Sequence, residues 1–96
     1  MAPTELKRYQ IADNNWEEFL AVWRRIVTVR RRHGFGILFA FADREQNMFT
    51  WAIDHDGDFD AAAKAYYDDP ERVELEIVER YVTSHEIRKV EVLDLP

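Results

Sequence analysis

The sequence predicts an α+β domain in which strands and helices follow one another in the order β-α-β-β-α-β. Two observations support this expectation. The segment Trp16–Arg32 carries apolar side chains at helical spacing, and residues 35–43 and 47–55 form two adjacent apolar runs that alternate as strands do. Both runs are apolar on both faces, whereas an antiparallel sheet in a small protein usually has one polar face. We therefore expect the sheet to be covered on both sides.

The alternation within the two runs predicts which side chains share a face. In the first run, one face is expected to hold Phe35, Ile37, Phe39 and Phe41, and the other Gly36, Leu38, Ala40 and Ala42. In the second run, we expect one face with Phe49, Trp51 and Ile53 and another with Met48, Thr50 and Ala52. The larger face of the second run is expected to hold any pocket and the smaller face to meet a second cover, with the reverse arrangement as the alternative.

The N-terminal elements are expected to be a strand and a long helix. Thr4–Ile11 alternates as a strand does, and Trp16–Arg32 follows it as the helix. Asn15 and Glu18 have the spacing of a capping box, and the helix is expected to end at His33-Gly34. Five arginines cluster around this helix, and we interpret them as a solvated basic face, with an anionic-ligand patch as the alternative: Arg24, Arg25, Arg30, Arg31 and Arg32.

The C-terminal half is expected to contain an interrupted helix and a last strand. The link 44–46 is short enough to join the two apolar runs as an antiparallel hairpin. Residues 59–67 have a helical pattern with Asp58 as the cap, and the step Asp69-Pro70 starts a further helix. The apolar stripe of that helix is expected to run through Val73, Ile77 and Tyr81. Residues 86–95 form the last strand, with Val90 and Val92 on one face and Ile87 and Leu93 on the other.

This order is the split βαβ, or ferredoxin-like, plan, and it predicts one four-stranded antiparallel sheet in a single domain over residues 1–96. The chain has helices enough to cover one face of such a sheet. The second cover is therefore expected to be another copy of the chain.

Composition excludes several classes of function. The net charge of −6 argues against a nucleic-acid partner, whose phosphates require neutralisation. Because the chain has no cysteine, disulfides, thiolate metal sites and cysteine nucleophiles are excluded. No apolar run reaches the roughly 20 residues of a membrane span, and the N-terminus lacks the pattern of a signal peptide. We expect a cytoplasmic protein with neither a membrane nor a nucleic-acid partner.

Three segments carry a resemblance to a known family: residues 16–19 (WEEF), 47–51 (NMFTW) and 65–72 (AYYDDPER). With the order of elements, they resemble the bacterial NIPSNAP-like proteins of the dimeric α+β barrel superfamily. The resemblance implies a homodimer closed through facing sheets, with a pocket between helices and sheet in each subunit. That superfamily includes cofactor-independent antibiotic-biosynthesis monooxygenases, haem-degrading monooxygenases, lactone isomerases and ligand-sensing domains, and most bacterial NIPSNAP-like members have no assigned reaction.

Six residues are the candidates for ligand binding: Trp23, Asn47, Trp51, His55, Tyr66 and Tyr67. Asn47 and Trp51 lie four apart on one predicted strand, and His55 continues their face. The resemblance implies that an asparagine and a tryptophan on the sheet can hold an aromatic substrate. The alternative is that Trp51 belongs to the core and Asn47 only begins the strand. The family pattern is incomplete here, because the first strand has no asparagine and Tyr66 stands where a histidine is usual.

No metal or cofactor is expected. An acidic turn surrounds Gly57, but an EF-hand loop that begins at Asp54 would need glycine at its sixth position and glutamate at its twelfth, where Phe59 and Ala65 stand. A turn that caps the next helix is the better interpretation. Gly-rich phosphate loops and nucleophile elbows are also missing.

Three functions remain open at this stage. The first is a small soluble homodimer of the NIPSNAP-like type that binds a small apolar or aromatic ligand and has no established reaction. The second is a cofactor-independent monooxygenase acting on an aromatic or polyketide-like compound. The third is a non-enzymatic ligand-sensing or interaction domain.

Overall fold

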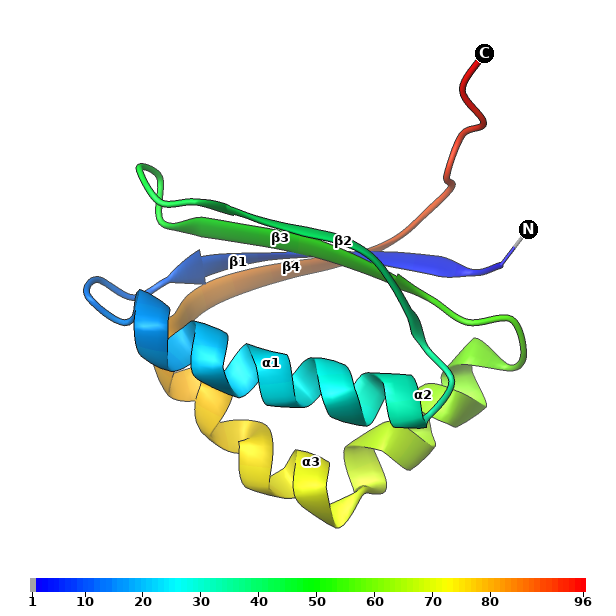
Figure 1. Cartoon of the computed structure of the whole chain (residues 1–96), viewed down its shortest axis with the longest axis horizontal. Coiled ribbons are helices and arrows are strands. Elements are labelled where there is room, and N and C mark those ends of the chain that lie inside the picture. The colour runs from blue at the N-terminus through cyan, green and yellow to red at the C-terminus, as the bar shows by residue number, and fades with distance from the viewer. Residues whose placement is uncertain (1) are drawn as a thin grey trace.

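All the helices lie on one face of a single antiparallel sheet in a computed structural model of the chain, which describes residues 2–96 (Figure 1). The sheet has the order β2-β3-β1-β4. Its strands are β1 (Thr4–Ile11), β2 (Gly36–Asp43), β3 (Met48–Asp54) and β4 (Val82–Val90). The helices are α1 (Trp16–Arg32), α2 (Phe59–Asp68), α3 (Pro70–Glu74) and a 3₁₀ helix, η1 (Leu75–Tyr81). The ferredoxin-like β-α-β-β-α-β order is confirmed. No helix within residues 2–96 is long and apolar enough to cross a membrane.

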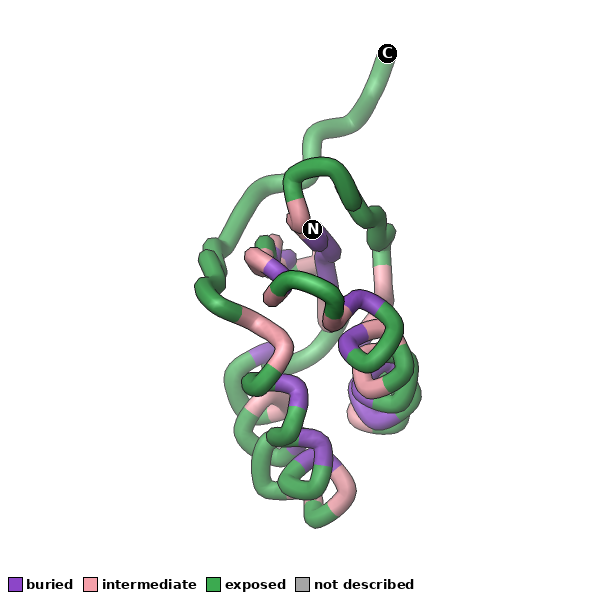
Figure 2. Tube along the Cα trace, turned by 90° about the vertical axis from the view of Figure 1, so that its left-hand side faces the viewer, coloured by how far each residue is buried: buried purple, intermediate pink, exposed green. Residues whose placement is uncertain are grey.

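The central strand β3 separates the two faces of the sheet. Phe49, Trp51 and Ile53 are all buried on the face that the helices cover. Phe49 packs against α1, with its ring centroid 4.9 Å from that of Phe19 and 5.0 Å from that of Trp23. The larger face of this run, which was expected to hold any pocket, is therefore the face under the helices, and the reverse arrangement is not observed. Figure 2 shows the buried stretches of the helices on their inner sides, which face one another and the sheet.

A β-bulge in β2 changes the facing of its side chains. Ile37 pairs with Ile53 and Phe39 pairs with Ala52, so Leu38 is an extra residue between them. The expectation that Ile37 shares a face with Phe39 and Phe41 is wrong, because one extra residue exchanges the faces of a strand. The bulge places small side chains of β2 beside large ones of β3. It pairs Ala40 with Trp51 and Ala42 with Phe49 under the helices, and it pairs Phe41 with Thr50 on the open face.

The open face of the sheet is uncovered in the described chain and is apolar over β2 and β3, whereas Arg8, Glu86 and Arg88 lie on it at β1 and β4. Phe39 and Phe41 are 44% and 58% exposed, and their rings stack with centroids 5.6 Å apart. Val90, on β4 at the opposite edge of the sheet, is also exposed. The side of the sheet away from the helices therefore has an apolar patch over β2 and β3 beside a charged region on β1 and β4.

The segment after Pro70 differs from the expected helix. It becomes 3₁₀ at Leu75, and a 3₁₀ helix has three residues per turn. Its buried side chains accordingly recur every three residues, at Arg72, Leu75 and Val78. The predicted stripe through Val73 and Ile77 is wrong, because both side chains are exposed.

The last strand also differs from the prediction. β4 begins at Val82, before the expected start at residue 86, and ends at Val90. Val92 and Leu93 lie beyond the strand and are exposed. Figure 1 shows this C-terminal stretch leading away from the sheet.

The helix caps follow the predictions in part. The Asp58 carboxylate accepts a hydrogen bond of 3.0 Å from the Ala61 backbone N–H, which confirms Asp58 as the N-cap of α2. Asn15 precedes α1 but makes no side-chain cap, and its amide donates instead to the Glu18 carboxylate at 2.7 Å. The predicted capping box is therefore wrong.

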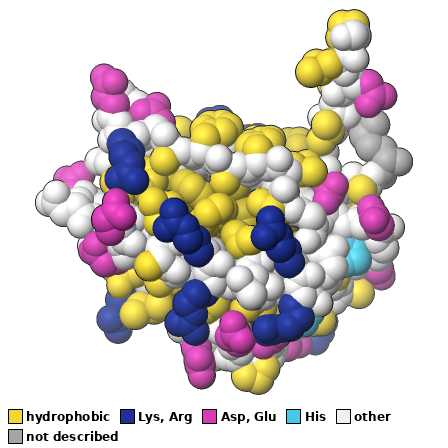
Figure 3. All heavy atoms as spheres, viewed as in Figure 1, with side chains coloured by type: hydrophobic (Ala, Val, Ile, Leu, Met, Phe, Trp, Pro, Cys, Tyr) yellow, Lys and Arg dark blue, Asp and Glu magenta, His cyan; other side chains and the backbone are white. Residues whose placement is uncertain are grey.

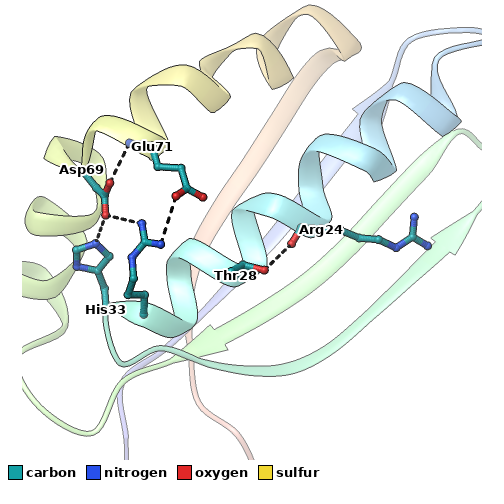
Figure 4. A network of polar contacts seen from close by, with 6 residues as sticks. Arg24, Thr28, His33, Asp69 and Glu71 are labelled. Atoms are coloured by element: carbon teal, nitrogen blue, oxygen red, sulfur yellow. Dashed lines mark hydrogen bonds and ion pairs between the residues drawn. The ribbon is translucent and has the colours of Figure 1, made fainter.

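Asp69 joins the corner between α2 and α3 to the C-terminal end of α1 (Figure 4). Its Oδ1 accepts from the Glu71 backbone N–H at 2.9 Å. Its Oδ2 lies 2.8 Å from His33 Nε2 and 2.9 Å from Arg32 Nη2. Hydrogen bonds from His33, from Arg32 and from the Glu71 backbone hold the pKa of Asp69 far below its ordinary value of 3.8. The carboxylate is thus charged at neutral pH and connects three elements.

Asp69→Asn is expected to lower the free energy of unfolding at neutral pH. The amide keeps an acceptor for the Glu71 N–H but loses the charge that faces Arg32 and His33. The pKa of Asp69 is lower in the folded than in the unfolded protein. Its contribution to the free energy of unfolding is therefore complete above the unfolded pKa, and it is lost as the pH falls from the unfolded pKa toward the folded one. Urea unfolding should show a larger difference between the two proteins at about pH 5 than at about pH 3. The opposite trend would contradict this role.

Candidate functional site

A cavity of about 230 Å³ lies between the helices and the sheet. Its walls are formed by β1, β3, β4, α1, α2, α3 and η1, so the cavity depends on the whole fold. Trp51, at the middle of β3, lines the cavity and is 2% exposed. Val78 from η1 and Ile87 from β4 also line it.

Four of the six predicted ligand-binding residues line this cavity: Trp23, Trp51, Tyr66 and Tyr67. The two indole rings meet edge to face, with centroids 5.7 Å apart, and the two tyrosine rings do so at 4.9 Å. The indole Nε1 of Trp23 is buried without a hydrogen-bond partner among residues 2–96, whereas that of Trp51 faces the Tyr9 hydroxyl. The cavity therefore combines aromatic walls with an unused indole N–H donor.

The other two predicted residues lie at the ends of β3, away from the cavity. Asn47 has a left-handed backbone (φ 52°), accepts a hydrogen bond from Trp16 Nε1 at 2.9 Å and donates to Asp13 Oδ1 at 2.9 Å. His55 Nε2 lies 3.0 Å from the carbonyl oxygen of His33, and its ring packs edge to face on Phe35 with centroids 4.9 Å apart. Both side chains fasten loops to neighbouring elements. The structure does not bring them together with Trp51.

Arg30 contributes a buried cation to the same cavity. It is 2% exposed, and its guanidinium carbon lies 3.8 Å from the centroid of the Tyr66 ring. Nη2 donates to the Tyr67 hydroxyl at 3.2 Å, but Nε and Nη1 have no partner in the described chain. The interpretation of the arginine cluster as a solvated face is wrong for this member, whereas Arg24, Arg25, Arg31 and Arg32 are exposed. Figure 3 shows Lys and Arg side chains among hydrophobic ones on the face of the molecule that is turned to the viewer.

The sequence did contain a signal for Arg30. The residue continues the apolar stripe of α1, four positions after Ile26 and seven after Trp23, and so belongs to the face that meets the sheet. A basic residue in the last turn of a helix is commonly explained by the helix dipole. For that reason Arg30 was interpreted as part of the solvated face.

Three further basic residues line the cavity, and sequence reasoning did not select them. Lys7 is buried and pairs with Glu5, with 2.9 Å between Nζ and Oε1. Arg72 is buried and pairs with Glu76 at 2.9 Å. His85 lies on β4, opposite Tyr9 of β1. His85 was missed because β4 was predicted to begin after it, and Arg72, in α3, because a charged side chain is ordinarily exposed.

Two cavity tyrosines, Tyr9 and Tyr66, are neutral at physiological pH. Burial raises the pKa of both Tyr9 and Tyr66 above the ordinary value, because ionisation would place a charge in a poorly solvated site. Their hydroxyls can therefore exchange hydrogen bonds but are not poised as bases. Within residues 2–96, no group of three or more His, Cys, Asp or Glu side chains could hold a metal ion.

The fold is shared with several solved structures. A NIPSNAP family protein from Agrobacterium tumefaciens superposes with a TM-score of 0.84 at 14% identity, covering 99% of this chain and 89% of its own. An uncharacterized NIPSNAP domain protein from Burkholderia xenovorans has a TM-score of 0.80 at 14% identity, with coverages of 95% and 94%. A putative antibiotic biosynthesis monooxygenase from Bacteroides thetaiotaomicron has a TM-score of 0.79 at 24% identity, with coverages of 97% and 90%. The resemblance to NIPSNAP-like proteins is thus confirmed for the fold. No family model and no curated protein matches the sequence.

Arg30→Met is expected to raise the free energy of unfolding by about 1 kcal/mol, because methionine keeps an unbranched apolar stem and removes a buried charge with unpaired donors. Chemical denaturation measures the change. Arg25→Met, on the exposed side of the same helix, is the matched control and should change stability by less than about 0.5 kcal/mol. A loss of more than about 2 kcal/mol in Arg30→Met would show that its contacts with the aromatic rings dominate.

Proposed function

We propose that this chain forms a homodimer of the NIPSNAP-like type and binds a small aromatic ligand in the cavity beneath its helices. The observation that carries the proposal is the joint lining of one cavity of about 230 Å³ by Trp23, Trp51, Tyr66 and Tyr67. Ligand sites are typically concave and aromatic, with a few placed polar groups. Drug-sized ligands occupy pockets of about 300–1,000 Å³, so the smaller volume here suits a compound of one or two rings.

The polar groups of the cavity support a ligand with polar substituents on its rings. The unused indole N–H group of Trp23 offers a hydrogen bond to an acceptor, and the neutral hydroxyl of Tyr66 can donate or accept. An empty apolar cavity would not need these groups. A bound aromatic compound would satisfy a donor that is otherwise buried and unpaired.

The monooxygenase alternative has less support. It depended on Asn47, Trp51, His55 and the two tyrosines sharing one pocket, and only Trp51 and the tyrosines line the cavity. The Asn47 amide is already engaged by Trp16 and Asp13. We therefore propose binding of an aromatic ligand without assigning a reaction to it.

The open sheet face supports the homodimer. Phe39 and Phe41 stack on each other there while remaining largely exposed, and Val90 adds to the apolar surface on β4. Exposed apolar patches of this kind mark interaction surfaces. A second copy of the same sheet offers the matching apolar face, because a two-fold interface brings the same patch together from both subunits.

Ile87→Trp should weaken binding of naphthalene-2-carboxamide by about tenfold or more, because the larger side chain fills the cavity. Isothermal titration calorimetry on the full chain measures the affinity. Val73→Trp places the same side chain on an exposed position of α3 and should leave the affinity unchanged. Equal loss in both variants, or unchanged binding in Ile87→Trp, would contradict the placement of the ligand in this cavity.

Phe41→Glu should convert the protein from a dimer to a monomer of 11.5 kDa, because the charge would be buried against the same face of the partner. Light scattering coupled to gel filtration at low micromolar concentration measures the mass. Leu95→Glu, in the exposed C-terminal stretch, is the control and should remain dimeric. A wild-type monomer would overturn the proposed dimer, and wild-type rings larger than a dimer would favour the interaction-domain alternative.

A further inference from the structure

We infer that the ligand of this cavity carries a carboxylate or a similar anionic group, which Arg30 binds beside Tyr66 and Tyr67. The inference rests on the proposed function, since it names the chemical class of the ligand that the cavity takes. It is carried by a buried guanidinium that has no anionic partner in the described chain.

The hydrogen-bonding capacity of Arg30 is mostly unused. A guanidinium has five N–H donors, and here only Nη2 has a partner, the Tyr67 hydroxyl at 3.2 Å. Nε and Nη1 are buried without any partner among residues 2–96. Burying a charge is costly unless it is paired and hydrogen-bonded, so a permanently empty site would be an unfavourable place for this side chain.

Aromatic rings account for the position of the guanidinium but not for its free donors. Its central carbon lies 3.8 Å from the Tyr66 ring centroid and 4.7 Å from that of Phe35. Such contacts attract the positive charge, but an aromatic ring offers no oxygen or nitrogen acceptor to the guanidinium N–H groups. The rings therefore fix the guanidinium in place while its donors remain available to a ligand.

The other cations of the cavity are already paired. Lys7 lies 2.9 Å from a Glu5 oxygen, and Arg72 lies 2.9 Å from a Glu76 oxygen. Glu79 also lines the cavity, but no carboxylate among residues 2–96 lies within 4.0 Å of the Arg30 nitrogens. Arg30 is thus the lining cation without an ion pair, and one anionic group on the ligand would balance it.

The geometry also orients such a ligand. Arg30 and Arg72 approach the same two rings, with the Arg72 carbon 5.4 Å from the Tyr66 centroid and 5.2 Å from that of Tyr67. Arg72 Nε is likewise buried without a partner in the described chain. The anionic group therefore lies at the tyrosine end of the cavity, and the aromatic ring extends toward Trp23 and Trp51.

The test compares naphthalene-2-carboxylate with the neutral naphthalene-2-carboxamide, by calorimetry on the full chain. The wild-type protein should bind the carboxylate about tenfold or more tightly than the carboxamide, because a charge-assisted hydrogen bond is stronger than a neutral one. Arg30→Gln should abolish that preference and retain carboxamide binding. Arg25→Gln, the same change on the exposed side of α1, should keep the preference.

Each outcome separates the inference from the function on which it rests. Equal binding of the two compounds by the wild type overturns the anionic ligand and leaves the aromatic site standing. Binding of neither compound overturns both. A preference that survives in Arg30→Gln overturns the role of Arg30. The wild-type comparison needs no variant, so it tests whether the ligand is anionic even if Arg30→Gln fails to fold. In that case Arg30→Lys, which keeps the charge, tests the role of Arg30 and should retain part of the preference.

Discussion

The structure depends on the packing of the large side chains of β3 against α1. Phe49 and Trp51 occupy the central strand beneath the helices, with Phe19 and Trp23 above them. Because side chains alternate along a strand, this arrangement also places Thr50 and the small Ala52 on the far side. That arrangement accounts for three features of this two-layer protein. The core lies on one face of the sheet, the second face keeps an apolar patch, and a cavity lies above the central tryptophan.

The cavity exists because the helical layer does not close completely over the sheet. α1 covers β2 and β3, whereas Arg72 of α3 and Val78 of the 3₁₀ segment line the cavity on the other helical arm. Asp69 holds the corner at the start of α3 against the end of α1. The two helical arms therefore meet through this charged contact as well as through apolar packing of α1 against Leu75 and Val78, and aromatic and basic side chains line the space between them.

Sequence reasoning predicted the fold more fully than the site. Thr4–Ile11 and Trp16–Arg32 have strong periodicity, and their bounds agree with the structure. The bulge at Leu38 and the 3₁₀ turn at Leu75 change the facing of side chains without a distinct local pattern, so the faces of β2 and η1 were assigned incorrectly. In the site, Trp51 was selected for its place on the strand and for the family resemblance, and the same resemblance pointed to Tyr66 and Tyr67.

The basic residues of the site were missed for a physical reason. The burial of a charge depends on the tertiary neighbours that receive it, and the Tyr66 ring comes from a helix that is distant in sequence. Asn47 and His55 show the converse. Their spacing from Trp51 placed them on its face, but each lies just outside β3, where its side chain binds a neighbouring loop or helix end instead of entering the cavity.

The bulge in β2 has a consequence for how this chain tolerates changes of length. The segment from α1 to the β2–β3 hairpin is one residue longer than the strand pairing requires, and Leu38 takes up the excess. Losing Leu38 would leave Phe39 opposite Ala52 and would preserve the outward facing of every later side chain. Losing Ala40 instead, with regular pairing from Ile37, would bring Phe39 opposite Trp51 and split the phenylalanine pair between the two faces. Two deletions of equal size, two positions apart, would thus have unequal effects on the outer surface of the sheet.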